Sequence, residues 1–423
     1  MDKLIIEGGS PLRGTVEISG AKNSALPIMA ASLLTDDACQ IDNIPALKDV
    51  DTMIKILRAL EAKVDRKGDS LLISGNFKKI KAPYSLVSTM RASVCVLGPL
   101  LAKKKRAEVS FPGGCVIGPR PIDLHLKGLE RLGAEIDVES GYIVAKTKRL
   151  KGTTLYLGGH FGSSVLATAN TMMAATLAEG TTVIENAACE PETVDLANFL
   201  ISMGAKIKGH STPTIAIKGV KKLHGTRYSI IPDRVESGTY LLAGAIAGGN
   251  IFIKNAQTLH LLAVIDKLRE CGIRVSEQKG GLRIIRNRSQ KIRPIAVTTL
   301  PYPGFPTDMQ AQMMSLLCLA DGISVVTEKI YPERFIHTSE LSRMGAHILV
   351  EGPNAIINGV EKLNGADVMA SDLRASAALV LAGLVAKGKT QVHRIYHLDR
   401  GYANLDKKLS GVGARIKREK ERQ

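Results

Sequence analysis

The stretch from Phe111 to Pro121 joins an irregular backbone to two side chains that could do chemistry. It reads Phe-Pro-Gly-Gly-Cys-Val-Ile-Gly-Pro-Arg-Pro, and so many glycines and prolines exclude a helix or a central strand. Arg120 could lower the pKa of the Cys115 thiol, or it could bind an anion while the loop closes over it. A surface turn with a chance cysteine is the simpler alternative, and this stretch alone leaves both open.

Six further polar residues stand at corresponding points, each at the expected start of an apolar helix. Four of them are cations, although the partial positive charge of a helix N-terminus disfavours a cation there unless an anion binds. The pattern therefore predicts an anion site, whereas the alternative pairs each arginine with a local carboxylate such as Asp372 or Asp233. The six residues are Lys22, Arg91, Ser164, Arg234, Asp308 and Arg374.

Asp308 is the one carboxylate among these positions. It could be an ordinary acidic residue in the first turn of a helix, which the helix dipole favours. Among so many cations it could also accept a proton from a substrate hydroxyl. Arg400, in Leu-Asp-Arg-Gly-Tyr, adds a further cation, with Asp399 as its alternative local partner.

A short phrase that ends a helix and opens a strand recurs along the chain, as in Met203-Gly204-Ala205-Lys206-Ile207. Its second position is a glycine in five copies and Glu61 in the first, and a glycine there suits the positive φ that often closes a helix. The copies are about 70 residues apart, which predicts six repeats over the whole chain. The second positions are residues 61, 133, 204, 272, 345 and 413.

Upstream of each phrase lies a segment that is apolar nearly all round, which predicts a buried helix. A β-branched strand and an amphipathic surface helix follow. Six such units predict an α/β protein of two domains, each with three repeats, buried helices and surrounding sheets, and a cleft lined by helix starts. The expected buried helices are residues 25–34, 92–102, 165–178, 238–247, 311–320 and 375–386.

Charge and aromatic content limit the classes of molecule that this chain is expected to bind. The net charge of +17, from 57 Lys and Arg against 40 Asp and Glu, suits nucleic acid, a membrane surface or phosphorylated small molecules. Aromatic residues make up 4% of the chain and Trp is absent, so few side chains could stack on bases. The charge pattern therefore favours small anionic substrates over nucleic acid.

Neither a metal site nor a membrane segment is expected. The six cysteines are scattered without a C-x-x-C pair, and the nine histidines form no recognisable ligand set. The longest apolar run, residues 377–386, is about half of what a bilayer crossing needs, and the N-terminus lacks an export signal. We expect a cytoplasmic protein without membrane insertion; its oligomeric state is not predicted.

Five motifs resemble those of the UDP-N-acetylglucosamine 1-carboxyvinyltransferases, enolpyruvyl transferases of the EPSP synthase family. They occur in the same order over essentially the whole chain: Gly20–Pro27, Pro112–Pro121, Gly304–Gln310, Asp372–Ser376 and Asp399–Tyr402. The resemblance implies an inside-out α/β barrel in two domains, residues 22–231 and residues 1–21 plus 232–423. It also implies transfer of the enolpyruvyl group of phosphoenolpyruvate to the 3-hydroxyl of UDP-N-acetylglucosamine, by addition and elimination with release of phosphate. This reaction opens peptidoglycan synthesis and requires no cofactor or metal.

The resemblance also implies roles for single residues. Asp308 acts on the sugar 3-hydroxyl, and Cys115 is a general acid for protonation at C3 or for product turnover. The residues implied to hold phosphoenolpyruvate are Lys22, Asn23, Arg120, Arg374 and Arg400. Those implied to contact the nucleotide sugar are Arg91, Arg120, Pro121, Ile122, Asp123, Leu124, Gly162, Ser163, Ser164, Val165, Asp308 and Ile330.

One segment departs from the family, and two other functions compete. Where the family commonly has Ser-Val-Gly-Ala-Thr, this chain has Leu166 in place of the glycine, beside the expected nucleotide contacts. Sister transferases acting on shikimate 3-phosphate share the fold, but the cysteine loop and the Asp-Arg-Gly-Tyr motif favour the nucleotide sugar. A basic nucleic-acid-binding repeat protein would explain the charge but not the thiol loop.

Overall fold

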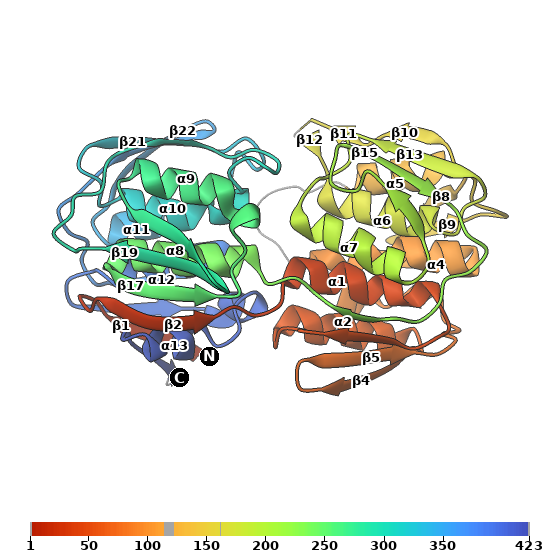
Figure 1. The fold of residues 1–423 in the computed structure, drawn as a ribbon, viewed down its shortest axis with the longest axis horizontal. Helices are drawn as coiled ribbons and strands as arrows, with labels where there is room; N and C mark the ends of the chain where they lie inside the picture. The colour runs from red at the N-terminus through yellow and green to blue at the C-terminus, as the bar shows by residue number, and fades with distance from the viewer. Residues whose placement is uncertain (1, 114–121, 161, 422–423) are drawn as a thin grey trace. The chain divides into compact units, whose positions relative to one another are not determined.

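A computed structural model describes residues 2–113, 122–160 and 162–421 (Figure 1). The chain forms two compact units. The central unit runs from Gly20 to Ile231, apart from the undescribed residues, and the terminal unit combines the chain up to Ser19 with the chain from Pro232 onward. Within the described ranges, no helix combines the length and apolar character needed to cross a membrane.

The central unit alternates buried helices, surface helices and short strands. Its helices are α1 (Lys22–Ala31), η1 (Ser32–Leu34), α2 (Lys48–Ala59), α3 (Tyr84–Val87), η2 (Arg91–Val96), α4 (Leu97–Lys104), α5 (Asp123–Arg131), α6 (Val165–Ala175) and α7 (Pro191–Ser202). Its strands are β3 (Cys39–Asp42), β4 (Lys63–Lys67), β5 (Ser70–Ser74), β6 (Lys81–Ala82), β7 (Arg106–Ser110), β8 (Glu135–Glu139), β9 (Tyr142–Lys146), β10 (Thr154–Tyr156), β11 (Gly158–Gly159), β12 (Gly162–Ser163), β13 (Thr181–Glu185), β14 (Lys206–Lys208), β15 (Thr214–Lys218) and β16 (Arg227–Ser229).

The terminal unit repeats this alternation. Its helices are α8 (Arg234–Ala247), η3 (Thr258–Leu261), α9 (Leu262–Glu270), η4 (Thr307–Met309), α10 (Gln310–Leu317), α11 (Thr338–Arg343), α12 (Leu373–Gly383), η5 (Ile395–Arg400) and α13 (Leu405–Gly411). Its strands are β1 (Asp2–Glu7), β2 (Leu12–Glu17), β17 (Gly249–Lys254), β18 (Arg274–Gln278), β19 (Gly281–Arg286), β20 (Ala296–Thr298), β21 (Ile323–Thr327), β22 (His347–Glu351), β23 (Asn354–Asn358), β24 (Asp367–Met369), β25 (Lys389–His393) and β26 (Arg415–Lys420).

The described strands form six four-stranded sheets of one design, three in each unit, and a small ribbon of β11 and β12. In the sheet β20-β21-β23-β22, for example, β20 runs parallel to β21 and the remaining neighbours are antiparallel. In four of the sheets the parallel pair is a crossover that encloses a buried helix, namely β6–β7, β10–β13, β20–β21 and β24–β25. The predicted α/β fold of six repeats is confirmed.

Three sheets are completed by strands from a distant part of the chain. Strand β1 lies between β25 and β26, pairing Leu4 with Val392 and Ile6 with Ile416. Strand β2 runs parallel to β17, and β16, at the end of the central unit, runs parallel to β3 near its beginning. Each unit is thus closed by pairing its first and last segments.

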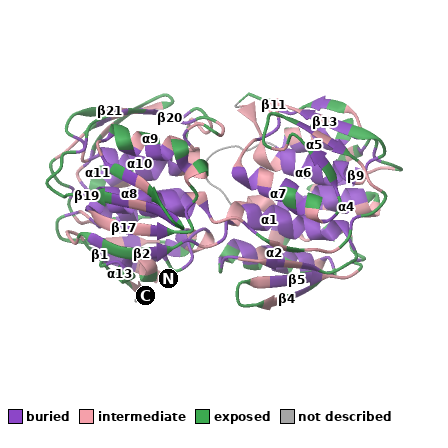
Figure 2. Ribbon diagram, viewed as in Figure 1, coloured by how far each residue is buried: buried purple, intermediate pink, exposed green. Residues whose placement is uncertain are grey.

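The cores are built on the helices that were expected to be buried. Helix α8 buries every residue from Val235 to Ala247, and α12 buries every residue from Arg374 to Gly383. Figure 2 shows the burial colour concentrated on helices such as α6 and α8, whereas strands such as β4 and β5 alternate buried and exposed residues. Many of these helical residues are alanines, whose small side chains let helices and sheets approach closely.

The glycines of the repeated phrase lie where a helix ends with positive φ. Gly133, Gly204, Gly272 and Gly413 have φ of 94°, 97°, 86° and 101°, as the phrase predicts. In the first copy Glu61 occupies the same position with φ of 72°. A side chain with a Cβ is disfavoured there, so this turn is built at a local conformational cost.

Candidate active site

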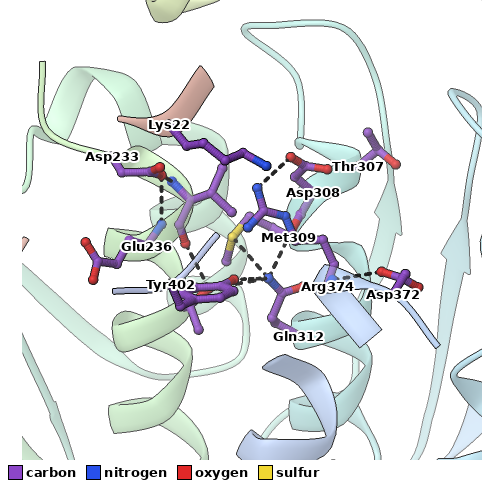
Figure 3. Close-up of polar contacts among 12 residues, drawn as sticks. Lys22, Asp233, Glu236, Thr307, Asp308, Met309, Gln312, Asp372, Arg374 and Tyr402 are labelled. Carbon is purple, nitrogen blue, oxygen red and sulfur yellow. Dashed lines mark hydrogen bonds and ion pairs between the residues drawn. The ribbon is translucent and has the colours of Figure 1, made fainter. Parts of the chain in front are cut away.

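The centre of the candidate site in the terminal unit is Asp308, in η4 just before the buried helix α10. One carboxylate oxygen, Oδ1, accepts a hydrogen bond from Arg334 at 2.9 Å. The other, Oδ2, accepts one from Arg374 at 2.9 Å (Figure 3). The side chains of Arg334 and Arg374 are only 5% and 4% exposed, against 29% for Asp308. One partly accessible carboxylate therefore balances two buried guanidinium groups.

Electrostatics explain why both arginines stay charged at this depth. Burial is the largest single effect and lowers the pKa of Arg374, but the charge and hydrogen bond of Asp308, together with the nearby Tyr402 and Asp233, raise that pKa above its ordinary value. The pKa of Arg334 is raised through the same balance, with Asp308 again the largest opposing charge. Pairing of this kind fixes both cations in place before any ligand binds.

Asp372 has a different role from the one considered for it in the sequence. Its carboxylate accepts hydrogen bonds from the backbone N–H groups of Arg374 and Ala375 at 2.7 and 3.1 Å, so it is the N-cap of α12. The alternative that Arg374 forms a local ion pair with Asp372 is therefore wrong, since the guanidinium pairs with Asp308. Asp233 likewise caps α8 through the backbone N–H groups of Val235 and Glu236.

Tyr402 lies directly beneath Arg374. The guanidinium carbon is 5.6 Å from the centre of the Tyr402 ring, within reach of a cation–π interaction. The Tyr402 hydroxyl lies 2.8 Å from Thr239 Oγ1 and accepts a hydrogen bond from Gln312 Nε2 at 3.2 Å. Helices α8, α10 and α12 thus share one buried polar network under the cation (Figure 3).

Glu328 organises the other side of Asp308 and is fully buried. Its carboxylate accepts hydrogen bonds from the hydroxyls of Thr299 and Thr307 at 2.6 and 2.9 Å. It also accepts bonds from the backbone N–H groups of Ile330 and Tyr331 at 2.8 and 3.0 Å. Glu328 therefore fixes the residue before Asp308 and the turn that contains Ile330.

Arg400 lies near the start of α12, because the backbone of the next residue, Gly401, packs closely against it. A Cβ atom on Gly401 would lie 2.6 Å from Leu373 Cδ2, so the absence of a side chain lets this loop pack against Leu373 at the start of α12. The preceding Asp399 accepts a pair of hydrogen bonds from Arg418 at 2.7 and 3.0 Å. The end of η5, with Arg400 on it, is thereby held on both sides.

Lys22 and Asn23 begin α1 in the central unit, as the sequence predicts. Lys22 Nζ lies 3.5 Å from Oδ2 of Asp49, which is in the first turn of α2. Both side chains are largely buried, with exposed fractions of 12% and 7%. The start of this buried helix therefore carries a cation that rests on a neighbouring helix start.

Arg91 begins η2, next to a buried neutral histidine. Burial, reinforced by the charge of Arg91, lowers the pKa of His125 to about 3. Asn170 lies 2.8 Å from His125 Nδ1 and is also bonded to the carbonyl of Val94 and the N–H of Gly98. This network fixes the helical segment behind Arg91 against α5 and α6.

The segments expected to contact the nucleotide meet within the central unit. Ile122 precedes α5, Asp123 and Leu124 begin it, and a Cβ on Gly159 would lie 3.1 Å from Leu124 Cδ1. Gly162 and Ser163 form β12, Ser164 caps α6 through the N–H of Ala167, and Val165 is the first residue of that helix. The β11–β12 ribbon therefore lies beside the start of α5.

Three sequence-predicted residues, Cys115, Arg120 and Pro121, lie outside the described residues. Two residues that the sequence reasoning missed are Arg334 and Glu328, both in the connection between β21 and α11. Their only sequence signal is proximity to Ile330, because this connection does not follow the repeat. Among the described residues, no cluster of His, Cys, Asp and Glu could hold a metal ion.

Comparison with known proteins covers the whole chain. The family model described as EPSP synthase (3-phosphoshikimate 1-carboxyvinyltransferase) matches residues 6–409. A UDP-N-acetylglucosamine 1-carboxyvinyltransferase of Methylacidiphilum infernorum is 53% identical over 418 residues, covering 99% of both chains. One of Caldanaerobacter subterraneus is 53% identical over 416 residues, covering 98% of this chain and 99% of the relative.

Solved structures agree at the level of the fold. The enolpyruvyl transferase NikO from Streptomyces tendae superposes with a TM-score of 0.88 at 24% identity, over 99% of this chain and 98% of its own. An EPSP synthase from Acinetobacter baumannii superposes with a TM-score of 0.76 at 17% identity, over 99% of this chain and 100% of its own.

Proposed function

This chain belongs to the EPSP synthase family, and from that premise we infer that it is an enolpyruvyl transferase acting on UDP-N-acetylglucosamine. It transfers the enolpyruvyl group of phosphoenolpyruvate to the sugar 3-hydroxyl and releases phosphate. The reaction is an addition followed by an elimination and begins peptidoglycan synthesis. The observation that carries this conclusion is full-length identity of 53% to several relatives named for this activity.

We propose that phosphoenolpyruvate is bound by a set of cations together with Asn23. Lys22 and Asn23 contact it from the start of α1, and Arg374 and Arg400, with Arg120, balance its phosphate and carboxylate. What supports this assignment is that Arg374 is held rigidly by Asp308 and Tyr402, so little reorganisation is needed as charge develops.

Asp308 accepts the proton of the 3-hydroxyl as its oxygen attacks C2 of phosphoenolpyruvate. Two guanidinium groups favour its ionised form, which a proton acceptor requires. Cys115 supplies a proton to C3 or assists product turnover; elimination then breaks the C2–O bond to phosphate and returns the C3 proton. Arg91, Ile122 to Leu124, Gly162 to Val165 and Ile330, with Arg120 and Pro121, contact the nucleotide sugar.

Substrate choice is tested by measuring phosphate release from phosphoenolpyruvate with either of two acceptors. We expect release with UDP-N-acetylglucosamine, whose mass rises by one enolpyruvyl group, and none with shikimate 3-phosphate. The reverse preference would assign the chain to the sister activity, and binding of RNA without turnover would refute both. A cytoplasmic location is proposed with this function, since both substrates are charged metabolites.

The role of Cys115 is tested separately from substrate choice. Cys115→Ser is expected to abolish enolpyruvyl transfer in the same assay while the melting temperature stays unchanged. Alkylation by fosfomycin, followed by mass spectrometry, should modify the wild-type chain at Cys115 only. Full activity of the serine variant would remove Cys115 from the mechanism without affecting the assignment of the acceptor.

A further inference from the structure

A cavity of about 700 Å³ lies over the edge of the terminal-unit sheet formed by β2, β17 and β19. Its lining includes four arginines, one from β2 and three from β19 and the residues after it, together with Thr15 and Asn250. The arginines are Arg13, Arg283, Arg286 and Arg288. None of the candidate active-site residues lines it, and its volume is in the range of small-molecule sites.

Register explains why the arginines gather here. Arg13 on β2 pairs with Asn250 on β17, which pairs with Ile285 on β19, so these residues lie side by side on the sheet. Arg283 lies two residues before Ile285, so its side chain is on the same face of β19. It donates a hydrogen bond to Asn250 Oδ1 at 2.8 Å. Three adjacent strands thus present cations and amide groups to one space.

Arg286, at the end of β19, lies on the opposite strand face from Arg283 and borders the cavity as its most buried arginine, with 9% exposure. Its guanidinium donates to the carbonyls of Ala245 and Ile246 at the C-terminal end of α8 and to the carbonyl of Gln290, while its Nε has no hydrogen-bond partner. The negative end of the α8 dipole accounts for part of its stability. A buried cation normally also has a counter-charge, whereas within the described ranges Arg286 has backbone carbonyls as its acceptors and no carboxylate.

The cavity carries positive charge that the described chain does not neutralise. Among the described residues, no carboxylate forms an ion pair with any of the four arginines. Burial first, and then the nearby charge of Arg288, lower the pKa of Arg286, as expected where like charges crowd together. This crowding is unfavourable unless an anion enters.

We propose that this cavity is a second anion site, which binds a small molecule carrying a diphosphate or two neighbouring phosphate groups. Phosphate oxygens match the paired N–H donors of guanidinium groups, and the hydroxyl of Thr15 and the amide of Asn250 add neutral donors. The cavity lies at the C-terminal end of α8. Thr239, which contacts Tyr402 beneath Arg374, lies in the N-terminal half of the same helix.

The test is calorimetric titration of pyrophosphate into the wild-type chain and into the double variant Arg13→Gln/Arg288→Gln. We expect binding at this site to weaken at least tenfold in the variant, with turnover unchanged. The matched control is Lys206→Gln/Lys218→Gln, which removes the same charge from exposed, register-paired strand positions in the central unit. A parallel titration with UDP distinguishes a nucleotide ligand from the free diphosphate.

The two double variants distinguish a specific anion site from a general effect of net charge. Equal weakening in both double variants, or in neither, overturns the site, because the effect would then reflect net charge alone or no binding at all. A melting experiment covers the case of poor folding: without anion, Arg288→Gln should melt at or above the wild-type temperature, and pyrophosphate should raise the wild-type value more. Both double variants leave the proposed catalytic residues intact, so failure here does not bear on the enolpyruvyl transfer.

Discussion

The two units balance charge differently at the starts of their buried helices. In the terminal unit, Asp308 contacts Arg334 and Arg374 at 2.9 Å, and both guanidinium groups are almost inaccessible. In the central unit, Lys22 and Asp49 are 3.5 Å apart, beyond the distance of a strong hydrogen bond. In the terminal unit one carboxylate therefore balances two buried cations, whereas the contact between Lys22 and Asp49 in the central unit is longer.

Replacing Asp308 should have the largest effect on stability and activity, and it should show the contrast between the two units most clearly. Asp308→Ala leaves two buried cations without their carboxylate, so we expect a loss of about 3 kcal/mol in the free energy of unfolding. Enolpyruvyl transfer should fall by about 10³-fold, since a proton acceptor is lost. Urea unfolding and phosphate release measure the two effects. Wild-type stability in this variant would show that the arginines are balanced elsewhere.

Glu328 tests whether Asp308 depends on the network behind it. In Glu328→Gln an amide N–H₂ replaces an oxygen that accepts hydrogen bonds, so we expect a loss of about 2 kcal/mol in stability. Displacement of Thr307 and Ile330 should lower kcat/KM for UDP-N-acetylglucosamine about tenfold, mainly through KM. The control is Glu333→Gln at a nearby exposed position, which should leave both values unchanged. A fall in kcat with KM constant would argue against this positioning role.

Acid should destabilise the central unit through His125. Its pKa is about 3 when folded and 6.5 in the unfolded reference, so the unfolded chain takes up its proton first as the pH falls. The free energy of unfolding should therefore drop by about 2 kcal/mol between pH 6.5 and pH 5 from this residue. His125→Gln should flatten that part of the profile. An unchanged slope would mean that His125 does not remain neutral in the folded chain.

Replacing Asp49, the partner of Lys22 in the central unit, should reduce stability less than replacing Asp308 does. Asp49→Asn keeps the shape of the side chain and removes a charge from the first turn of α2. We expect a loss of about 1 kcal/mol in stability, from the helix dipole and the long contact with Lys22. Thermal unfolding of this variant beside Asp308→Ala measures the contrast directly. Equal losses would remove the distinction between the units.

The smallest effect is expected to be a gain. Glu61 has positive φ at a position where the other copies of the phrase have glycine, so Glu61→Gly should stabilise the chain by about 1 kcal/mol. The lost contact with Lys79 is exposed and contributes little. Lys79→Gln measures that contribution alone in the same melting experiment. Destabilisation by Glu61→Gly would mean that the glutamate side chain has a structural role.

Much of the fold could be predicted because each repeat carries local sequence signals for helix ends and for buried helices. Glycines such as Gly204 mark helix ends, and a segment that is apolar on all sides is expected to be buried. The spacing of the repeat therefore located the six buried helices that precede the repeated phrase. Lys22, Arg91 and Arg374 could be predicted to lie at helix starts because they occupy corresponding positions in the repeat. Arg334 and Glu328 lie in an irregular connection, and nothing local indicates that their partners are Asp308 and Thr299. The pairing of β1 with β26 is equally invisible, since it joins segments more than 400 residues apart.

That pairing sets an order for folding during synthesis. Strands β1 and β2 leave the ribosome first, but their partners β17, β25 and β26 come from the second half of the chain. The central unit, closed by β16 on β3, contains all of its own strands and can complete its sheets while synthesis continues. The earliest residues of the protein are thus among the last to reach their final partners, and until then they expose unpaired strand edges to other chains.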